Sequence, residues 1–301
     1  MARHGASCRL PMDAARGFGV TSSGNVMVIL VTARRHMAAA TLTTSSSVSV
    51  EVGRDGEGFM GGKSEGMAVD GFVGMDDLAR LEDEQRRLAS LTPPPWHPEP
   101  GPVVCGGVFV AFARGQEGPG RTGDRALVGA VATRDTTELA RVVIEGGAGA
   151  PYQPGYLAAR EGAMIEDALR ALVATGVQPD VILVDATGRD HARRAGLALH
   201  VGAVLDVPTV GVTHRPLLAS GPEPEDVVGA TSELQLDGVI VGRWLRVHEG
   251  VRPLAVHSAW RTDDRTAVVV VSRVTGEART PEPLRLARTV ARVTRAELEG
   301  R

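Results

Sequence analysis

The stretch at residues 181–212 reads VILVDATGRDHARRAGLALHVGAVLDVPTVGV. It starts with an apolar, β-branched run over 181–184, which predicts a buried strand that ends at the carboxylate of Asp185. A helix is expected over 193–202, and the run over 207–212 predicts a second apolar strand. Two apolar strands joined by a helix are typical of a parallel crossover, so the stretch predicts an α/β protein.

The segments on either side of this crossover complete a mixed sheet. Three upstream segments with short polar links predict an antiparallel meander, at 103–112, 126–133 and 139–144. A helix with an apolar stripe is expected over 156–174. Downstream, the patterns predict strands at 239–244, 254–259 and 267–271 and a helix at 283–293. An antiparallel meander followed by a parallel crossover, flanked by helices, is the order of a ribonuclease H-like α/β fold.

The first 73 residues differ in composition from the rest. They contain a Ser-, Thr- and Val-rich run over 41–49 and then a glycine-rich run, and no helical or strand period persists. We expect residues 1–73 to be a disordered low-complexity extension and residues 74–301 to be the folded domain. A translation start assigned too far upstream would give the same pattern. Asp76 and Asp77 can cap a helix at the start of this domain, with leucines spaced along one face.

Composition limits the functional classes. The 301 residues carry a formal net charge of -3, so the chain has no overall positive charge that would indicate nucleic-acid binding, although a local basic groove is compatible with it. Lys63 is the one lysine, so arginine supplies the cations of the folded part. Two cysteines are too few for a disulfide framework or a cysteine zinc site, and no apolar run approaches the roughly 18 residues of a membrane span. We expect a cytoplasmic protein with no membrane partner.

Two carboxylates are candidates for a divalent metal site. Asp185 follows a central strand, at the end where ligands bind in open α/β sheets, and Glu161 lies in the first turns of the helix over 156–174. Carboxylates that converge from different elements hold the metal ion that phosphodiester cleavage needs. Each also has a structural interpretation, because Asp185 can cap its loop and the helix dipole favours a surface glutamate. His191 either acts on a phosphate or is a solvated loop residue.

Two further features are candidates for nucleic-acid contacts. Arg193 and Arg194, next to Arg189, suit bidentate contacts to phosphate, and equally suit the solvated start of a helix. The turn PYQPG at 151–155 displays Tyr152 between Pro151 and Pro154. Because the prolines restrict the backbone, an exposed tyrosine there could wedge into a base stack or cover a flat ligand. The alternative is a tyrosine that packs on the adjacent helix.

Several segments together resemble the endonuclease V family. PYQPGYLAARE at 151–161 is similar to its Pro-Tyr-x-Pro-Gly…Arg-Glu segment, and the match continues through 184–185, 191–202 and 206–212. The resemblance extends from residue 76 to about 293. It implies a ribonuclease H-like fold and cleavage of DNA or RNA near deaminated purines, chiefly inosine, with Mg²⁺ or Mn²⁺.

The resemblance also implies roles for individual residues. Glu161 and Asp185 match metal ligands of the family, and His191 matches a residue that assists near the scissile phosphate. Tyr152, with Pro151 and Pro154, matches the wedge that separates strands beside the damaged base.

Four positions depart from the family pattern. Phe109 stands where the first strand of the family has a metal-ligating aspartate, and His214 stands where the family has a lysine that contacts the reacting phosphate. The Asp-Gly-His-Gly loop has become DATG at 185–188, and Trp260 occupies a late Gly-His-Arg segment. These losses predict a weakened or altered metal-dependent nuclease. The alternative is a non-nuclease that uses the scaffold to bind nucleic acid, a nucleoside-like small molecule or a protein. We expect a monomer, although the sequence leaves the oligomeric state open.

Overall fold

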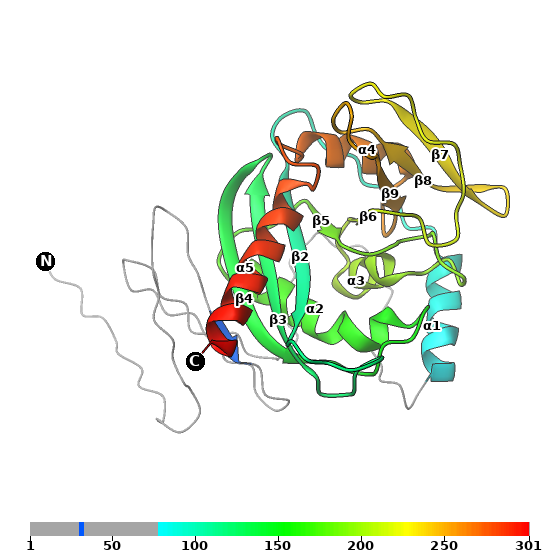
Figure 1. Ribbon diagram of the computed structural model, residues 1–301. Helices are drawn as coiled ribbons and strands as arrows, with labels where there is room; N and C mark the ends of the chain where they lie inside the picture. The colour runs from blue at the N-terminus through cyan, green and yellow to red at the C-terminus, as the bar shows by residue number, and fades with distance from the viewer. Residues whose placement is uncertain (1–29, 33–77, 301) are drawn as a thin grey trace, which may run out of the picture.

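The computed structural model describes residues 30–32 and 78–300. The domain boundary predicted at residue 73 and the cap predicted at Asp76 and Asp77 lie outside these residues. Within the described part, a nine-stranded mixed sheet has the order β1-β4-β3-β2-β5-β6-β9-β8-β7, and helices lie against both of its faces (Figure 1). This arrangement confirms the predicted ribonuclease H-like α/β fold.

The predicted meander occupies one half of the sheet. It consists of β2 (Val104–Phe112), β3 (Arg125–Arg134) and β4 (Thr137–Gly147), each antiparallel to the next. β3 is buried along its length apart from its two end residues, because helices cover both of its faces, and this explains its unbroken apolar sequence. The short strand β1 (Leu30–Thr32) pairs parallel with β4 and lies within the segment for which no regular structure is expected.

The predicted crossover lies in the middle of the sheet. Strand β5 (Val181–Val184) pairs parallel with both β2 and β6 (Thr209–Thr213), and α3 (Leu197–Leu205) connects β5 to β6. Helix α3 begins at Leu197 rather than near residue 193, because Arg194 has φ 58°, which is incompatible with a right-handed helix. Asp185, the residue after β5, therefore lies near the middle of the sheet, at the edge where the parallel strands end.

The other half of the sheet contains one strand that the sequence analysis missed. Strands β7 (Thr231–Leu236), β8 (Val239–Leu245) and β9 (Leu254–Ser258) are antiparallel, and β9 pairs with β6. β7 was not predicted because only one of its residues, Leu234, is buried, so its sequence carries no apolar period.

The strand predicted over 267–271 is wrong, because these residues form the middle of helix α4 (Asp264–Arg273). The β-branched run resembles a strand, yet the backbone N–H of Thr266 donates to the side chain of Asp263, which caps the helix. The buried residues Ala267, Val270 and Val271 then follow helical spacing.

The helices divide between the two faces of the sheet. Helices α1 (Leu78–Ser90), α2 (Leu157–Val173) and α3 share one hydrophobic core, and α4 and α5 (Glu282–Glu299) cover the opposite face (Figure 1). Among the described helices, none is long and apolar enough to cross a membrane.

Helix α5 lies unusually close to the meander. A Cβ added to Gly107 of β2 would be 2.4 Å from the backbone carbonyl carbon of Pro283, and one added to Gly129 of β3 would be 2.4 Å from the carbonyl oxygen of Ala287. Only glycine allows the backbones of helix and strands to approach this closely. The first half of α5 is therefore fixed against β2 and β3.

Candidate active site and nucleic-acid interface

The parallel pairing of β2 with β5 places Phe109 beside Asp185. Val108 of β2 is the register partner of Val184 of β5, so the residues that follow them are neighbours at the carboxyl edge. Phe109 packs on the α5 face of the sheet, against a cluster that includes Leu127 and Val290. The position next to Asp185 thus carries a hydrocarbon ring and no oxygen.

Two arginines of α5 surround this pair. Arg288 Nη2 donates to Oδ2 of Asp185 at 3.0 Å, and the guanidinium carbon of Arg288 lies 5.1 Å from the centroid of the Phe109 ring. The guanidinium carbon of Arg292 lies 5.2 Å from the same centroid. Both distances are typical of cation–π contacts. The Asp185 carboxylate therefore already has a cationic partner.

Glu161 lies in the first turns of α2 and faces the same region. Burial raises the pKa of the Glu161 carboxyl to about 7; the positive charge of Arg160 opposes this increase and the negative charge of Asp185 adds to it. Because Asp185 influences Glu161 electrostatically, the structure brings the two predicted metal ligands into one neighbourhood. The pKa of Glu161 therefore lies near neutral pH.

His214 follows β6 and lines a small pocket together with Asp185 and Arg288. The pocket has a volume of about 10 Å³, which is room for about one water molecule. Partial burial lowers the pKa of His214, and the positive charges of Arg279 and Arg288 lower it further against the opposing charge of Asp185. The imidazole is therefore neutral at pH 7 and does not supply the positive charge of a lysine.

The loop that follows His214 is fixed by a buried aspartate that the sequence analysis did not select. Asp190 accepts hydrogen bonds from the backbone N–H groups of Leu217, Leu218 and Ala219, at 2.6, 2.9 and 2.8 Å. A fully buried carboxylate with three donors is well satisfied. Asp190 thus holds the loop after β6 in place.

These residues do not fit a divalent metal site. Magnesium is usually held by one or two free carboxylates together with other oxygen ligands. Here Phe109 offers no oxygen and Asp185 is ion-paired with an arginine. Within the residues that the structure describes, no three histidine, cysteine, aspartate or glutamate side chains are grouped so that they could hold a metal ion.

The loop at 151–155 is held at both ends by arginines. At its start, Arg160 Nη1 donates to the carbonyl of Ala150 at 2.7 Å, while its guanidinium carbon lies 4.1 Å from the centroid of the Phe112 ring. The backbone N–H of Tyr152 donates to the carbonyl of Pro119 at 2.6 Å. The Tyr152 side chain is 52% exposed. An aromatic ring is therefore presented to solvent from an anchored backbone.

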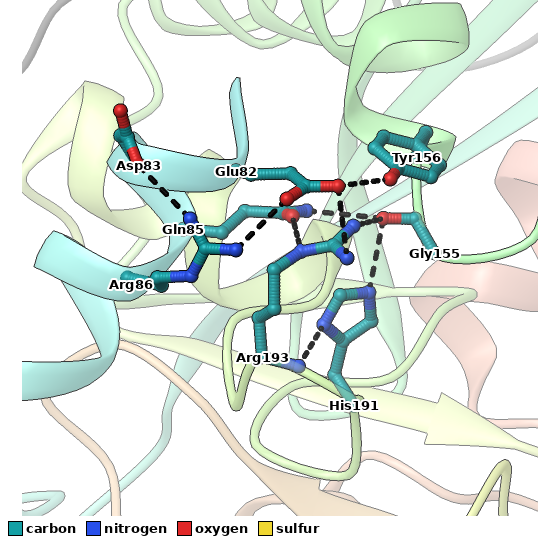
Figure 2. Close-up of polar contacts among 8 residues, drawn as sticks. All are labelled: Glu82, Asp83, Gln85, Arg86, Gly155, Tyr156, His191 and Arg193. Carbon is teal, nitrogen blue, oxygen red and sulfur yellow. Dashed lines mark hydrogen bonds and ion pairs between the residues drawn. The ribbon is translucent and has the colours of Figure 1, made fainter. Parts of the chain in front are cut away.

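At the end of the loop, the Gly155 carbonyl is the centre of a polar network (Figure 2). It accepts hydrogen bonds from Gln85 Nε2 at 3.2 Å, from His191 Nε2 at 3.2 Å and from Arg193 Nη2 at 2.9 Å. Gly155 has φ 82°, a left-handed conformation that favours glycine and turns its carbonyl toward these donors. Side chains from α1 and from the loop after β5 therefore hold the end of the 151–155 loop.

His191 is a neutral member of this network. The backbone N–H of Arg193 donates to His191 Nδ1 at 3.2 Å, so the ring proton is on Nε2 and points to the Gly155 carbonyl. Burial lowers the pKa of His191, and the charge of Arg193 lowers it further. Both ring nitrogens have protein partners, which makes His191 a support of the loop in this structure.

The arginines predicted to bind phosphate have protein partners as well. Arg193 donates through Nε to Gln85 at 2.6 Å, lies 3.5 Å from Glu82, and has its guanidinium carbon 4.5 Å from the centroid of the Tyr156 ring (Figure 2). Arg194 pairs with Asp237 at 3.0 Å. The structure therefore places Arg193 in the contact between α1 and α2.

The remaining divergent position lies in the core. Trp260 is buried in the cluster shared by α1, α2 and α3, and its Nε1 donates to Oδ1 of Asp206 at 3.2 Å. Its role in this structure is to pack against α3, where a Cβ on Gly202 would be 2.4 Å from the Cβ of Trp260.

Sequence reasoning missed the residues that α1 and α5 contribute. Gln85 and Glu82 look like ordinary residues of a surface helix, and no local pattern connects them with Gly155. Arg288 and Arg292 did leave a signal, because four arginines recur along α5 at helical spacing, at 285, 288, 292 and 295. That spacing would have predicted a positive stripe along one side of the helix.

Comparison with known proteins agrees with the resemblance seen in the sequence. A family model described as Endonuclease V matches residues 96–289. Endonuclease V of Methanopyrus kandleri is 39% identical over 162 residues, which cover 54% of this chain and 69% of the relative. Endonuclease V of Dictyoglomus turgidum is 35% identical over 151 residues, which cover 50% of this chain and 65% of the relative. The matched segment thus spans about two thirds of the length of these relatives.

Solved structures show the same relationship. The endonuclease V of Streptomyces avermitilis superimposes with a TM-score of 0.66 and 31% identity, over 76% of this chain and 96% of that one. A Ciona intestinalis endonuclease V, solved in complex with a 24mer DNA containing an inosine followed by a ribo-adenosine, shares the fold with a TM-score of 0.63 at 20% identity. It covers 74% of this chain and 99% of that one. The relatives are named as endonucleases, which are enzymes that hydrolyse phosphodiester bonds within a nucleic-acid strand. With the family model matched over residues 96–289, more than half of its length, the chain belongs to the endonuclease V family.

Proposed function

We propose that this protein binds DNA or RNA that contains a deaminated purine, chiefly inosine, and that it cleaves the phosphodiester backbone only weakly. Membership of the endonuclease V family supports the choice of substrate. The anchored loop at 151–155 supports binding, and the residues around Asp185 support weak cleavage.

The observation that carries the proposal is the exposed Tyr152 on a loop fixed at both ends. Arg160 holds the start of the loop through the Ala150 carbonyl, and the network at Gly155 holds its end (Figure 2). A rigid loop presents an aromatic ring without the entropic cost of ordering it on binding. Stacking of a base on such a ring contributes about 1–3 kcal/mol.

Weak cleavage follows from the charges at the centre, by which we mean Asp185 together with Glu161, His214, Phe109 and Arg288. Asp185 is paired with Arg288, so its carboxylate is not available to place or activate a water molecule for attack on phosphorus. His214 is neutral at pH 7 and is a poorer partner for the phosphate than a lysine. Glu161, with a pKa of about 7, can take up or release a proton near neutral pH.

A second candidate function is binding without any cleavage. The observation that favours it is the joint presence of Phe109 beside Asp185 and Arg288 on both of them, since this removes one expected ligand and neutralises another. The two candidates differ only in whether a slow, inosine-dependent nick is produced.

A binding and cleavage assay separates these functions. Single- and double-stranded DNA and RNA oligonucleotides with one inosine are compared with adenosine-containing strands, in EDTA, in magnesium and in manganese. We expect tighter binding to the inosine strands and cleavage far slower than that of the Streptomyces avermitilis relative assayed in parallel. Loss of any residual cut in Glu161→Gln would assign it to this site. Equal affinity for inosine and adenosine strands would contradict the proposal.

A further inference from the structure

The altered centre contains its own cation. Arg288 donates to Asp185 Oδ2 at 3.0 Å and at the same time lies over the Phe109 ring, which occupies the neighbouring position on β2. A guanidinium is planar and weakly hydrated, so it can stack on an aromatic face while one edge binds a carboxylate. A phenylalanine at position 109 therefore suits an arginine at position 288, because the ring stacks with the guanidinium that binds Asp185.

The position of Arg288 is fixed by the backbone. Ala287, its neighbour in α5, has its carbonyl oxygen 2.4 Å from the place where Gly129 would carry a Cβ. Pro283, one turn earlier, is equally close to Gly107. Because α5 is seated on β2 and β3 in the turn that precedes Arg288, the backbone from which the Arg288 side chain extends is fixed close to Asp185 and Phe109.

Contacts with Asp185 and Phe109 hold the guanidinium of Arg288 in a largely buried position. Its side chain is only 26% exposed, and its Nε is buried and has no hydrogen-bond partner among the described residues. Burying a guanidinium donor without a partner is costly, so compensating interactions must hold the side chain here. Asp185 and the Phe109 ring supply them.

We propose that Arg288 is the resident cation of this centre and that it takes the place of a divalent metal ion as the charge partner of Asp185. Two consequences follow. The protein does not bind manganese or magnesium at Asp185 and Glu161. Restoring an aspartate at position 109 is not sufficient to restore metal binding, because Arg288 would pair with both aspartates.

The first test uses the wild-type protein and manganese alone. Electron paramagnetic resonance of Mn²⁺ measures free ion, and we expect no loss of the free signal on addition of the wild-type protein at millimolar manganese. Stoichiometric binding that disappears in Asp185→Asn would overturn the proposal. This measurement needs no variant that alters folding.

The second test is a thermal-shift series with manganese. Wild type and Phe109→Asp are expected to shift by less than about 1 °C, whereas Phe109→Asp combined with Arg288→Gln is expected to rise by about 3 °C or more, as ligand linkage requires. The matched control is Phe109→Asp with Arg285→Gln, because Arg285 lies on the same helix and pairs with Glu282 instead of Asp185. An equal shift in Phe109→Asp alone would show that Arg288 does not exclude the ion.

A third measurement rests on the proposed function. Affinity for an inosine-containing strand is expected to agree within about twofold between EDTA and magnesium at equal ionic strength, since the phosphate meets a guanidinium rather than a metal ion. A requirement for the divalent ion would overturn the inference. If the protein binds no nucleic acid at all, the proposed function fails, and the manganese experiments still decide the role of Arg288.

Discussion

The loop at 151–155 and the centre at Asp185 differ in the kind of contact that holds them. The loop keeps its sequence and is held through backbone carbonyls, at Ala150 and Gly155. The centre depends on several side chains that converge on one point, where Arg288 contacts both the Asp185 carboxylate and the Phe109 ring. The comparison indicates that the loop is held by contacts to its backbone, whereas the contacts of Asp185 depend on which side chains meet there.

The largest effect on stability is expected where α5 packs against β2, because this contact holds Arg288 beside Asp185. Gly107→Val puts a side chain into the backbone of Pro283, so α5 must lift from β2 and move Arg288 away from Asp185. We expect the free energy of unfolding to fall by about 3 kcal/mol or more, as measured by urea denaturation.

The adjacent residue provides the control for this prediction. A Cβ on Gly106 would meet only side-chain atoms of Ile182 and Pro179, at 3.3 and 3.4 Å. Gly106→Ala should therefore cost much less than Gly107→Val. If both variants lose the same free energy of unfolding, the close contact between α5 and β2 is not what holds Arg288 beside Asp185.

The next effect concerns the buried carboxyl of the centre. The folded-state pKa of Glu161, about 7, lies above its ordinary value of 4.5, so the folded state binds the proton more tightly. Stability is then lost as pH rises from about 4.5 to about 7, by at most about 3 kcal/mol. Glu161→Gln should remove this loss, which urea denaturation at pH 5 and pH 8 will measure. An unchanged difference between the two pH values would contradict the assignment.

A smaller effect tests the loop side of the comparison. Arg193→Met removes the donors to Gly155 and Gln85 and the ion pair with Glu82, and we expect a loss of about 2 kcal/mol in the free energy of unfolding. Arg86→Met is the matched control, because Arg86 also pairs with Glu82 but is 59% exposed. Its expected cost is below about 0.5 kcal/mol, measured by the same denaturation. If both variants lose the same stability, the network does not support the loop.

The smallest effect on stability is expected at Tyr152, where a substitution should change binding and leave the fold intact. Tyr152→Ala removes an exposed ring and should change the free energy of unfolding by less than about 0.5 kcal/mol. The same change should weaken binding of inosine-containing strands by about 1–3 kcal/mol, measured by fluorescence anisotropy. Unaltered affinity would remove Tyr152 from the interface.

Local patterns in the sequence were sufficient for most of the architecture. Helix α2 and strands β2 to β6 were predicted within a few residues, because buried apolar side chains recur with the period of each element. The pattern failed where a different local interaction dominates. The Asp263 cap made a helix of a β-branched run, and the exposed strand β7 had no period to detect.

The sequence by itself determined the family, most of the order of the elements and the positions that depart from the family resemblance, since each of these is written in contiguous residues. Only the tertiary structure decided what those positions contact. Arg288 is 103 residues from Asp185 along the chain, and Gln85 is 70 residues from Gly155. No local spacing encodes such pairs, because they exist only once helices on opposite faces of the sheet, α5 and α1, have packed. The physical reason is that periodicity reports which face of an element is buried, whereas a charge acquires its partner from whatever the fold brings within a few ångströms.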